Sequence, residues 1–281
     1  MRNVVVVAIA ALLAVGGCSK ADLGAAAFVD GLRILGVQAD PPEALPGDTV
    51  TLTAWAVDPR GGPIDVSWSE CLLPSNGTAN PGCTDGTGNG LVGLGSGLTI
   101  SMVVPELDLA TLGPPDASYG VYLPIVLHAR APPDDVADVV YRLRVREVVA
   151  PGCTTAPPYG ENGCLPNQNP TFATIDPLGP EGAPINTNQG TVWALVARYT
   201  PDSDEEYKVP SKMDPTVPER LVTQWFATGG TFPDQPVGGT AVQKFTADRA
   251  PTYGGANIDL WIVGHDERGG TALAHRTFVL Q

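Results

Sequence analysis

Pro46-Gly-Asp-Thr-Val-Thr-Leu-Thr-Ala-Trp-Ala-Val57 is the stretch that decides the fold class of this 281-residue chain. Its first three residues are typical of a tight turn. The residues after the turn alternate, with one face made of Val50, Leu52, Ala54 and Ala56 and the other of Thr51, Thr53, Trp55 and Val57. An alternation with a period of two predicts a β-strand that has one buried face.

Further strands are predicted on both sides of this stretch, because turn residues separate short segments of the same kind. The chain also has 33 glycines and 28 prolines, and only 16% of its residues are charged. This composition, without a long helical periodicity, favours an all-β chain with many turns. The other strands predicted in the first half are Leu32–Ala39, Ile64–Ser69, Leu98–Val104, Val121–Arg130 and Val139–Val149.

The two halves of the chain repeat several features in the same order. Leu123–His128 matches Leu260–His265, Trp68 matches Trp225, and an Asp-Pro pair follows the first strand of each half. An internal repeat of this kind predicts two copies of one structural unit. We therefore expect two tandem antiparallel β-sandwiches. The predicted units are residues 31–150, a linking segment at 151–167, and residues 168–281.

Both copies resemble bacterial immunoglobulin-like domains, a broad group that shades into PKD-like and cadherin-like modules. The resemblance is carried by residues 46–52 with Trp68 in the first copy, and by Trp225 with residues 262–270 in the second. It implies turns and a core tryptophan, and it implies no ligand. The inter-sheet cysteine pair of antibody domains is absent from the sequence.

The N-terminal residues indicate export. Arg2 precedes the apolar run Val4–Val15, which is shorter than the roughly 20 apolar residues that span a bilayer. The run ends in Val15-Gly-Gly-Cys18, which resembles the lipobox of bacterial lipoproteins. The resemblance implies that residues 1–17 are a cleaved signal peptide, that Cys18 carries acyl chains, and that residues 18–30 continue as a spacer. An ordinary cleaved signal and an uncleaved anchor are the alternatives.

The position after Cys18 and the net charge bear on location. In this family Ser19, in place of aspartate, implies the outer membrane. The formal net charge is −14, with 30 acidic and 16 basic residues. This charge argues against nucleic acid as a partner and against charge-based adhesion to anionic lipid, because both need clustered Lys and Arg. The membrane is therefore expected to be a partner through the lipid alone.

Four further cysteines form two close pairs in the sequence. Cys71 and Cys83 bracket one loop, and Cys153 and Cys164 bracket another. An exported chain meets oxidising conditions, so two local disulfides are the simplest of the three possible connectivities. A zinc site is the rival interpretation, but the spacing and the lack of a nearby histidine fit zinc poorly. No cofactor is expected.

An acidic cluster lies in the insertion Thr200–Arg220, which has no counterpart in the first half. Its carboxylates make it a candidate calcium site, although the spacing of an EF-hand loop is absent and a solvated loop is the simpler interpretation. The same insertion is the candidate partner-binding loop, because long loops in compact domains are often functional. The candidate calcium ligands are Asp202, Asp204, Glu205 and Glu206.

These observations predict a non-enzymatic lipoprotein of the cell envelope that acts as an adhesion, scaffold or assembly module through loops or sheet edges. An envelope protein or a glycan is the expected partner. No arrangement around the three histidines indicates nucleophilic catalysis. The alternative function is a carbohydrate- or peptidoglycan-binding module, which would need exposed tryptophans. Trp68 and Trp225 are expected in the cores, and Trp55, Trp193 and Trp261 are the candidates for exposure.

Overall fold

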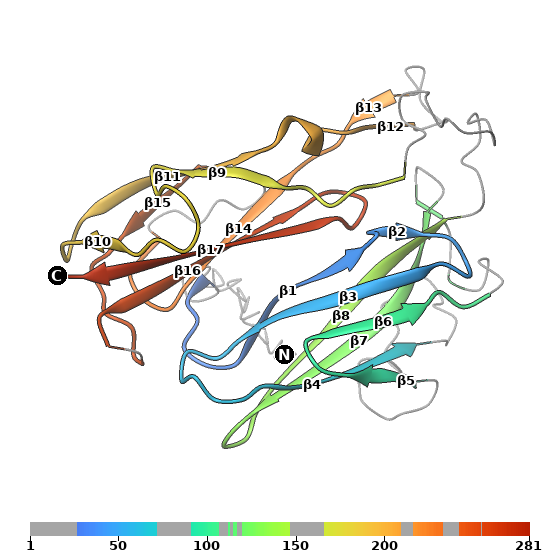
Figure 1. Ribbon diagram of the computed structural model, residues 1–281, viewed down its shortest axis with the longest axis horizontal. Helices are drawn as coiled ribbons and strands as arrows, with labels where there is room; N and C mark the ends of the chain where they lie inside the picture. Colours follow the sequence, from blue (N-terminus) through green and yellow to red (C-terminus); the bar gives the residue numbers. More distant parts are fainter. Residues whose placement is uncertain are drawn as a thin grey trace, which may run out of the picture.

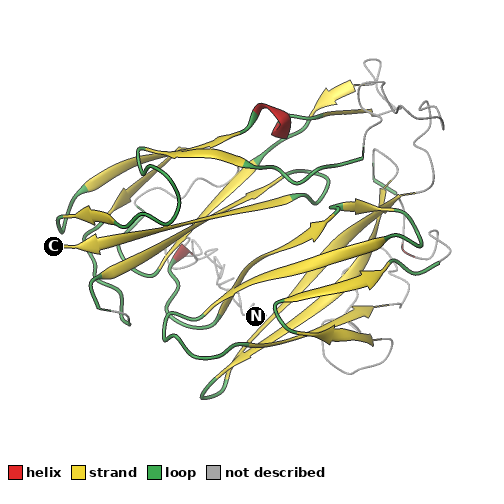
Figure 2. Cartoon of the chain, in the orientation of Figure 1, coloured by secondary structure: helices red, strands yellow, loops and turns green. Residues whose placement is uncertain are grey.

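The computed structural model describes residues 27–71, 91–106, 112, 115–116, 120–146, 166–208, 216–232, 242–253 and 255–281. Strands dominate these ranges, and a 3₁₀ turn labelled η2 (Pro201–Ser203) lies between two of them (Figure 2). Within them, no helix has the length and apolar character needed to cross a membrane.

Sandwich 1 contains two sheets with the orders β1-β3-β6 and β2-β8-β7-β4-β5. Neighbouring strands are antiparallel except for β2 and β8, which pair in parallel. The core between the sheets includes Trp68, whose indole Nε1 donates a hydrogen bond of 2.7 Å to the Gly97 carbonyl. The strands are β1 (Arg33–Asp40), β2 (Glu43–Ala44), β3 (Thr49–Val57), β4 (Asp65–Cys71), β5 (Leu91–Ser96), β6 (Thr99–Val103), β7 (Gly120–Ala131) and β8 (Asp135–Arg146).

Sandwich 2 repeats this topology, with the sheet orders β9-β11-β15 and β10-β17-β16-β14. Its short strand β10 pairs in parallel with the last strand, as β2 does with β8. A hairpin of β12 and β13 is inserted before β14. The strands are β9 (Phe172–Asp176), β10 (Ile185–Thr187), β11 (Val192–Tyr199), β12 (Glu206–Lys208), β13 (Thr216–Pro218), β14 (Val222–Ala227), β15 (Val242–Thr246), β16 (Asn257–His265) and β17 (Thr271–Leu280).

The fold class predicted from the sequence, two tandem immunoglobulin-like β-sandwiches, is confirmed (Figure 1). All six strands predicted in the first half are present, with small shifts at their ends. The turn at residues 46–48 forms as expected: Gly47 has a φ of 87°, and the Asp48 side chain accepts a hydrogen bond of 2.8 Å from the Leu45 amide. The strands β2 and β5 were not predicted.

The sequence repeat and the structural repeat differ in register. Trp68 lies opposite Leu127 in sandwich 1, whereas Trp225 lies opposite Ile262 in sandwich 2. His128 comes one residue after the partner of Trp68, whereas His265 comes three residues after the partner of Trp225. The two matched segments are therefore offset by two residues. An offset of two preserves which residues face the core, since side chains alternate along a strand. His128 and His265 therefore occupy different positions in the two sandwiches, although the sequence repeat aligns them.

The two sandwiches pack against each other through the outer faces of one sheet from each (Figure 1). A β-bulge between Ile34 and Gly36 turns Leu35 out of the first core and into this interface. The two sheets pack face to face. Their interface buries a separate apolar cluster between β1 and β3 on one side and β14, β16 and β17 on the other. The cluster consists of Val29, Leu35, Trp261 and Val263, with Trp55, Val57, Phe226 and Leu273 partly buried against it.

Polar contacts border this cluster. Asn169 donates a hydrogen bond of 2.7 Å to the Ala39 carbonyl in sandwich 1 and accepts one of 2.8 Å from the Thr271 amide in sandwich 2. Gln38 Nε2 donates to the Thr271 carbonyl at 2.7 Å. These bonds fix the sandwiches to each other in one arrangement. The two sandwiches therefore form one folded body.

The segment Ala27–Val29 precedes sandwich 1 in the chain but packs on sandwich 2. Phe28 forms a parallel β-bridge with Ala227 in β14, and the Val29 amide donates a hydrogen bond of 2.8 Å to the Ala227 carbonyl. The Phe28 ring lies 4.5 Å from the Arg249 guanidinium. The last residues of the segment predicted to be a spacer are thus an ordered part of the folded body.

Candidate functional site

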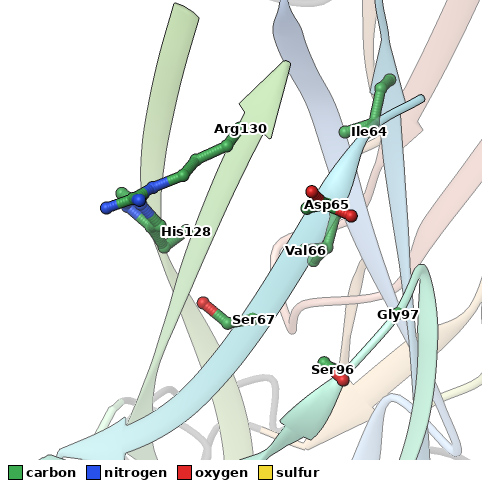
Figure 3. A pocket seen from close by; sticks show the side chains of 8 residues that line it. All are labelled: Ile64, Asp65, Val66, Ser67, Ser96, Gly97, His128 and Arg130. Carbon is green, nitrogen blue, oxygen red and sulfur yellow. The ribbon is translucent and has the colours of Figure 1, made fainter. Parts of the chain in front are cut away.

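A groove lies on the outer face of the five-stranded sheet of sandwich 1, over β4, β7 and the turn after β5 (Figure 3). Its volume is about 670 Å³, which lies within the range of small-molecule sites. An adjoining cavity of about 290 Å³ continues it toward the β7–β8 turn. Asp65 and Arg130 line both cavities, so the two form one continuous depression.

The groove carries a row of polar side chains because of the strand register. Ser96, Ser67, His128 and Asp138 stand side by side on β5, β4, β7 and β8. Their chain neighbours, such as Trp68, point into the core, so the alternation puts this row on the outer face. Of these residues the sequence singled out only the histidine. The others could have been identified as the polar residues that alternate with core residues along each strand.

Three of the side chains in and beside the groove form a chain of hydrogen bonds. His128 Nδ1 is bonded to an Asp138 carboxylate oxygen. Arg130 Nε donates a hydrogen bond of 2.7 Å to His128 Nε2. Because Nε2 accepts this bond, it carries no proton, and the proton of the neutral ring lies on Nδ1, which donates to Asp138. The arrangement fixes both the tautomer of His128 and the direction of the Arg130 guanidinium.

This row contains a serine, a histidine and an aspartate, but it does not form a nucleophile with a general base. A triad needs the histidine nitrogen that faces away from the aspartate to accept the serine proton. Here that nitrogen accepts a hydrogen bond from Arg130 instead. The geometry therefore suits polar recognition better than acyl transfer.

A second group of charged residues surrounds Arg268 in the β16–β17 turn. Arg268 Nε donates to Glu219 at 2.9 Å, and its Nη2 donates to Glu205 at 2.5 Å. The Tyr207 ring lies 5.2 Å from the guanidinium. Burial raises the pKa of Glu219 to about 7, and burial also raises the pKa of Glu205. The contacts bind the inserted β12–β13 hairpin to the turn.

The predicted calcium ligands do not converge in this arrangement. Asp202, Asp204 and Glu206 are exposed, and Glu205 is engaged by Arg268. Among the residues that the structure describes, no three His, Cys, Asp or Glu side chains are grouped so as to hold a metal ion. The insertion, expected to be a loop, is partly a hairpin. Its residues 209–215 lie outside the described ranges, and its role as a partner-binding loop stays a prediction.

All five tryptophans are at least partly covered. Trp68 and Trp225 lie in the two cores, as expected. Trp193 packs against the second core and donates a hydrogen bond of 3.2 Å to Thr187. Trp55 and Trp261 lie in the interface between the sandwiches. The exposed indole rings on which the carbohydrate-binding alternative depended are therefore absent.

The other two histidines have separate structural contacts. His275 Nε2 is 3.0 Å from an Asp259 oxygen, and its ring stacks on Trp261 with 5.3 Å between centroids. His265 Nδ1 is 3.3 Å from the Thr271 hydroxyl, and burial lowers the pKa of His265. These two histidines belong to the interface and the β16–β17 turn, apart from the groove.

Cys71 is completely buried at the end of β4 and takes part in a disulfide. Of the predicted disulfide cysteines it alone lies within the described ranges. Cys83, Cys153 and Cys164 lie outside them, as does the predicted lipidation site Cys18 with residues 1–17. The two pairings and the lipid anchor therefore stay predictions.

No protein-family model and no curated protein matches the sequence. Among solved structures, Drosophila N-cadherin EC1-4 is 12% identical with a TM-score of 0.24, covering 88% of this chain and 49% of that chain. Latent PorU from Porphyromonas gingivalis is 10% identical with a TM-score of 0.25, covering 89% and 24%. A nucleoside hydrolase-related hypothetical protein from Saccharophagus degradans is 16% identical with a TM-score of 0.28, covering 41% and 26%.

The chain thus spans less than half the length of each of these proteins. Their TM-scores are too low to establish a common fold with the whole chain. The assignment of the fold rests on the strand order and the pairing within the two sandwiches.

Proposed function

We propose that this protein is a non-enzymatic lipoprotein of the bacterial cell envelope, anchored through Cys18, and that it acts as a binding or assembly module. The observation that carries the proposal is the interface between the sandwiches, centred on Trp261 and Val263. It makes one continuous body, and the groove lies on the outer face of the five-stranded sheet of sandwich 1. A body of this kind suits the presentation of a binding face at a membrane.

The position of the N-terminal segment supports an anchored function. Ala27, the first residue that the structure describes, lies nine positions after Cys18. An extended chain of that length spans at most about 30 Å. The lipid would therefore hold the body close to the bilayer. The Val15-Gly-Gly-Cys18 motif supplies the lipid attachment, and Ser19 favours the outer membrane as the location.

Metabolic labelling with an alkyne fatty acid tests the anchor. The wild-type chain should incorporate the label, fractionate with outer membranes and be shortened by the signal peptide. Cys18→Ser should abolish labelling, whereas Ser19→Ala, one residue away, should leave it intact. Labelling that persists in Cys18→Ser would refute the anchor at this residue.

Cross-linking on intact cells, followed by identification of what co-purifies, tests the binding role. A stoichiometric protein partner would support an assembly module. Attached glycan would favour the sugar-binding alternative, although the covered tryptophans argue against it. Recovery of neither from cells that express the anchored protein would contradict a binding role.

A further inference from the structure

Two opposite charges in the groove face each other without pairing. Asp65 and Arg130 are direct partners in the register of β4 and β7, a position where opposite charges usually interact. Within the described part of the chain, neither makes an ion pair. Figure 3 shows the Arg130 side chain lying along His128, on the side away from Asp65.

Hydrogen bonds within the site keep the Arg130 guanidinium apart from the Asp65 carboxylate. Asp138 holds His128, and His128 Nε2 accepts the hydrogen bond of Arg130 Nε. The guanidinium has five N–H donors, of which this bond uses one. Its two Nη groups are left for a ligand. Three side chains on two strands thus hold the cation away from the nearest carboxylate.

Arg130 differs from the described arginines that form ion pairs. Acidic residues outnumber basic ones by 30 to 16. Some other described arginines do pair with carboxylates: Arg60 with Asp58, Arg198 with Asp176, and Arg268 with two glutamates. Among the described residues, Arg130 pairs with none of the carboxylates that line the adjoining cavity with it, Asp65, Asp134 and Asp135.

The charges around the groove limit what can bind. A simple anion would be attracted by Arg130 but repelled by Asp65, and by Asp134 in the adjoining cavity. A simple cation would meet the reverse arrangement at Arg130. A molecule that carries both a carboxylate and an ammonium can satisfy both residues at once, because each of its charges then has an opposite partner.

We propose that this groove binds a zwitterionic α-amino acid group. Its carboxylate lies on the Arg130 Nη groups and its ammonium on the Asp65 carboxylate. The hydroxyls of Ser67 and Ser96, which also line the groove, supply further hydrogen bonds. The inference deepens the proposed binding role by naming a ligand class, and it does not depend on the lipid anchor because the site lies wholly in sandwich 1.

Three small probes test the charge requirement: glycine carries both charges, N-acetylglycine only the carboxylate, and glycinamide only the ammonium. Each is titrated to about 50 mM into ¹⁵N-labelled protein at constant ionic strength, with amide shifts of β4 and β7 as the readout. Loss of one charge-assisted contact should weaken binding about tenfold. Glycine should therefore bind about tenfold more tightly than either analogue.

Substitutions assign the two contacts. Arg130→Gln should remove the advantage of glycine over glycinamide, and Asp65→Asn should remove its advantage over N-acetylglycine. Arg142→Gln is the matched control, because Arg142 is exposed on β8 of the same sheet and does not line the groove. All three positions are exposed, so the variants should fold, and their melting temperatures check this.

Several outcomes would overturn the inference. These are equal binding of the three probes, no binding of glycine within the titration, or a loss in Arg142→Gln as large as in Arg130→Gln. Failure here together with successful fatty-acid labelling would leave the proposed anchored function in place and remove only the ligand class.

Discussion

Gln38 Nε2 donates a hydrogen bond of 2.7 Å to the carbonyl oxygen of Thr271, which lies 233 residues further along the chain. The bond joins β1 of sandwich 1 to β17 of sandwich 2, next to the apolar cluster that the two sheets share. This hydrogen bond, at the edge of the apolar cluster, fixes how the two sheets are placed on each other. The two repeated sandwiches are thus joined into one folded body.

Substitution in the shared cluster should uncouple the sandwiches. Val263 is completely buried there, so Val263→Asp places a charge in an apolar interface and should cost at least about 3 kcal/mol of unfolding free energy. Calorimetry should show one transition for the wild type and two for the variant. Val192→Asp is the control, because Val192 is 63% exposed and its substitution should cost less than about 0.5 kcal/mol. A single unchanged transition in Val263→Asp would contradict the coupling.

Removal of the Phe28 ring should release the segment Ala27–Val29 from β14. The ring contacts Arg249, and its loss should cost about 1–2 kcal/mol. Hydrogen exchange at the Val29 amide, which is bonded to Ala227, should accelerate in Phe28→Ala. Tyr253→Ala, which removes an aromatic ring that is 43% exposed, should leave that exchange rate unchanged.

Glu219 should make the stability depend on pH. Burial raises the pKa of its carboxyl group to about 7 in the folded protein, above the ordinary value of 4.5. Between these values the folded state binds more protons than the unfolded state, so this group lowers stability as pH rises from about 4.5 to about 7. With solvent screening, the change should not exceed about 2 kcal/mol.

Urea unfolding across this pH range measures the effect of Glu219. Relative to Glu219→Gln, the wild-type protein should lose stability as pH rises. Glu206→Gln, at an exposed position in β12, should follow the wild-type curve. A pH-independent difference between Glu219→Gln and the wild type would show that Glu219 does not titrate in this range.

The cysteine pairing can be mapped directly. Peptide mapping without reduction should recover Cys71 linked to Cys83, and Cys153 linked to Cys164. Cys71→Ser should lower the free energy of unfolding by about 3 kcal/mol, the value expected for a closed loop of this size. A cross-linked Cys71–Cys153 peptide would reject local pairing.

The predictable part of the fold is the part in which one strand face is buried and the other is solvated. The alternation around Trp68 and after Pro46 depends on neighbouring residues only, so it could be seen in the sequence. Strand β5 was missed because Gly93 and Gly95 have no side chains and glycine has low strand propensity. The hydrogen bonds of its pairing with β4 hold β5 in the sheet, and they cannot be seen in the local sequence.

The interface and the groove depend on contacts between residues far apart in the chain. One local signal for the interface existed: the run Leu260–Val263 is apolar without alternation, which is typical of a strand covered on both faces. For the groove, the sequence gives no indication that Asp65 would lie opposite Arg130, since 64 residues separate them and only the register of β4 and β7 brings them together. The histidine was visible, but its neighbours were not.

The bridge between Phe28 and Ala227 also determines how the body would respond to a mechanical load. A pull on the chain ahead of Ala27 first stretches the bonds that tie Phe28 and Val29 to β14. Sandwich 1 is loaded through its first strand only after those bonds part. The bridge therefore bears tension on the N-terminus before β1 does.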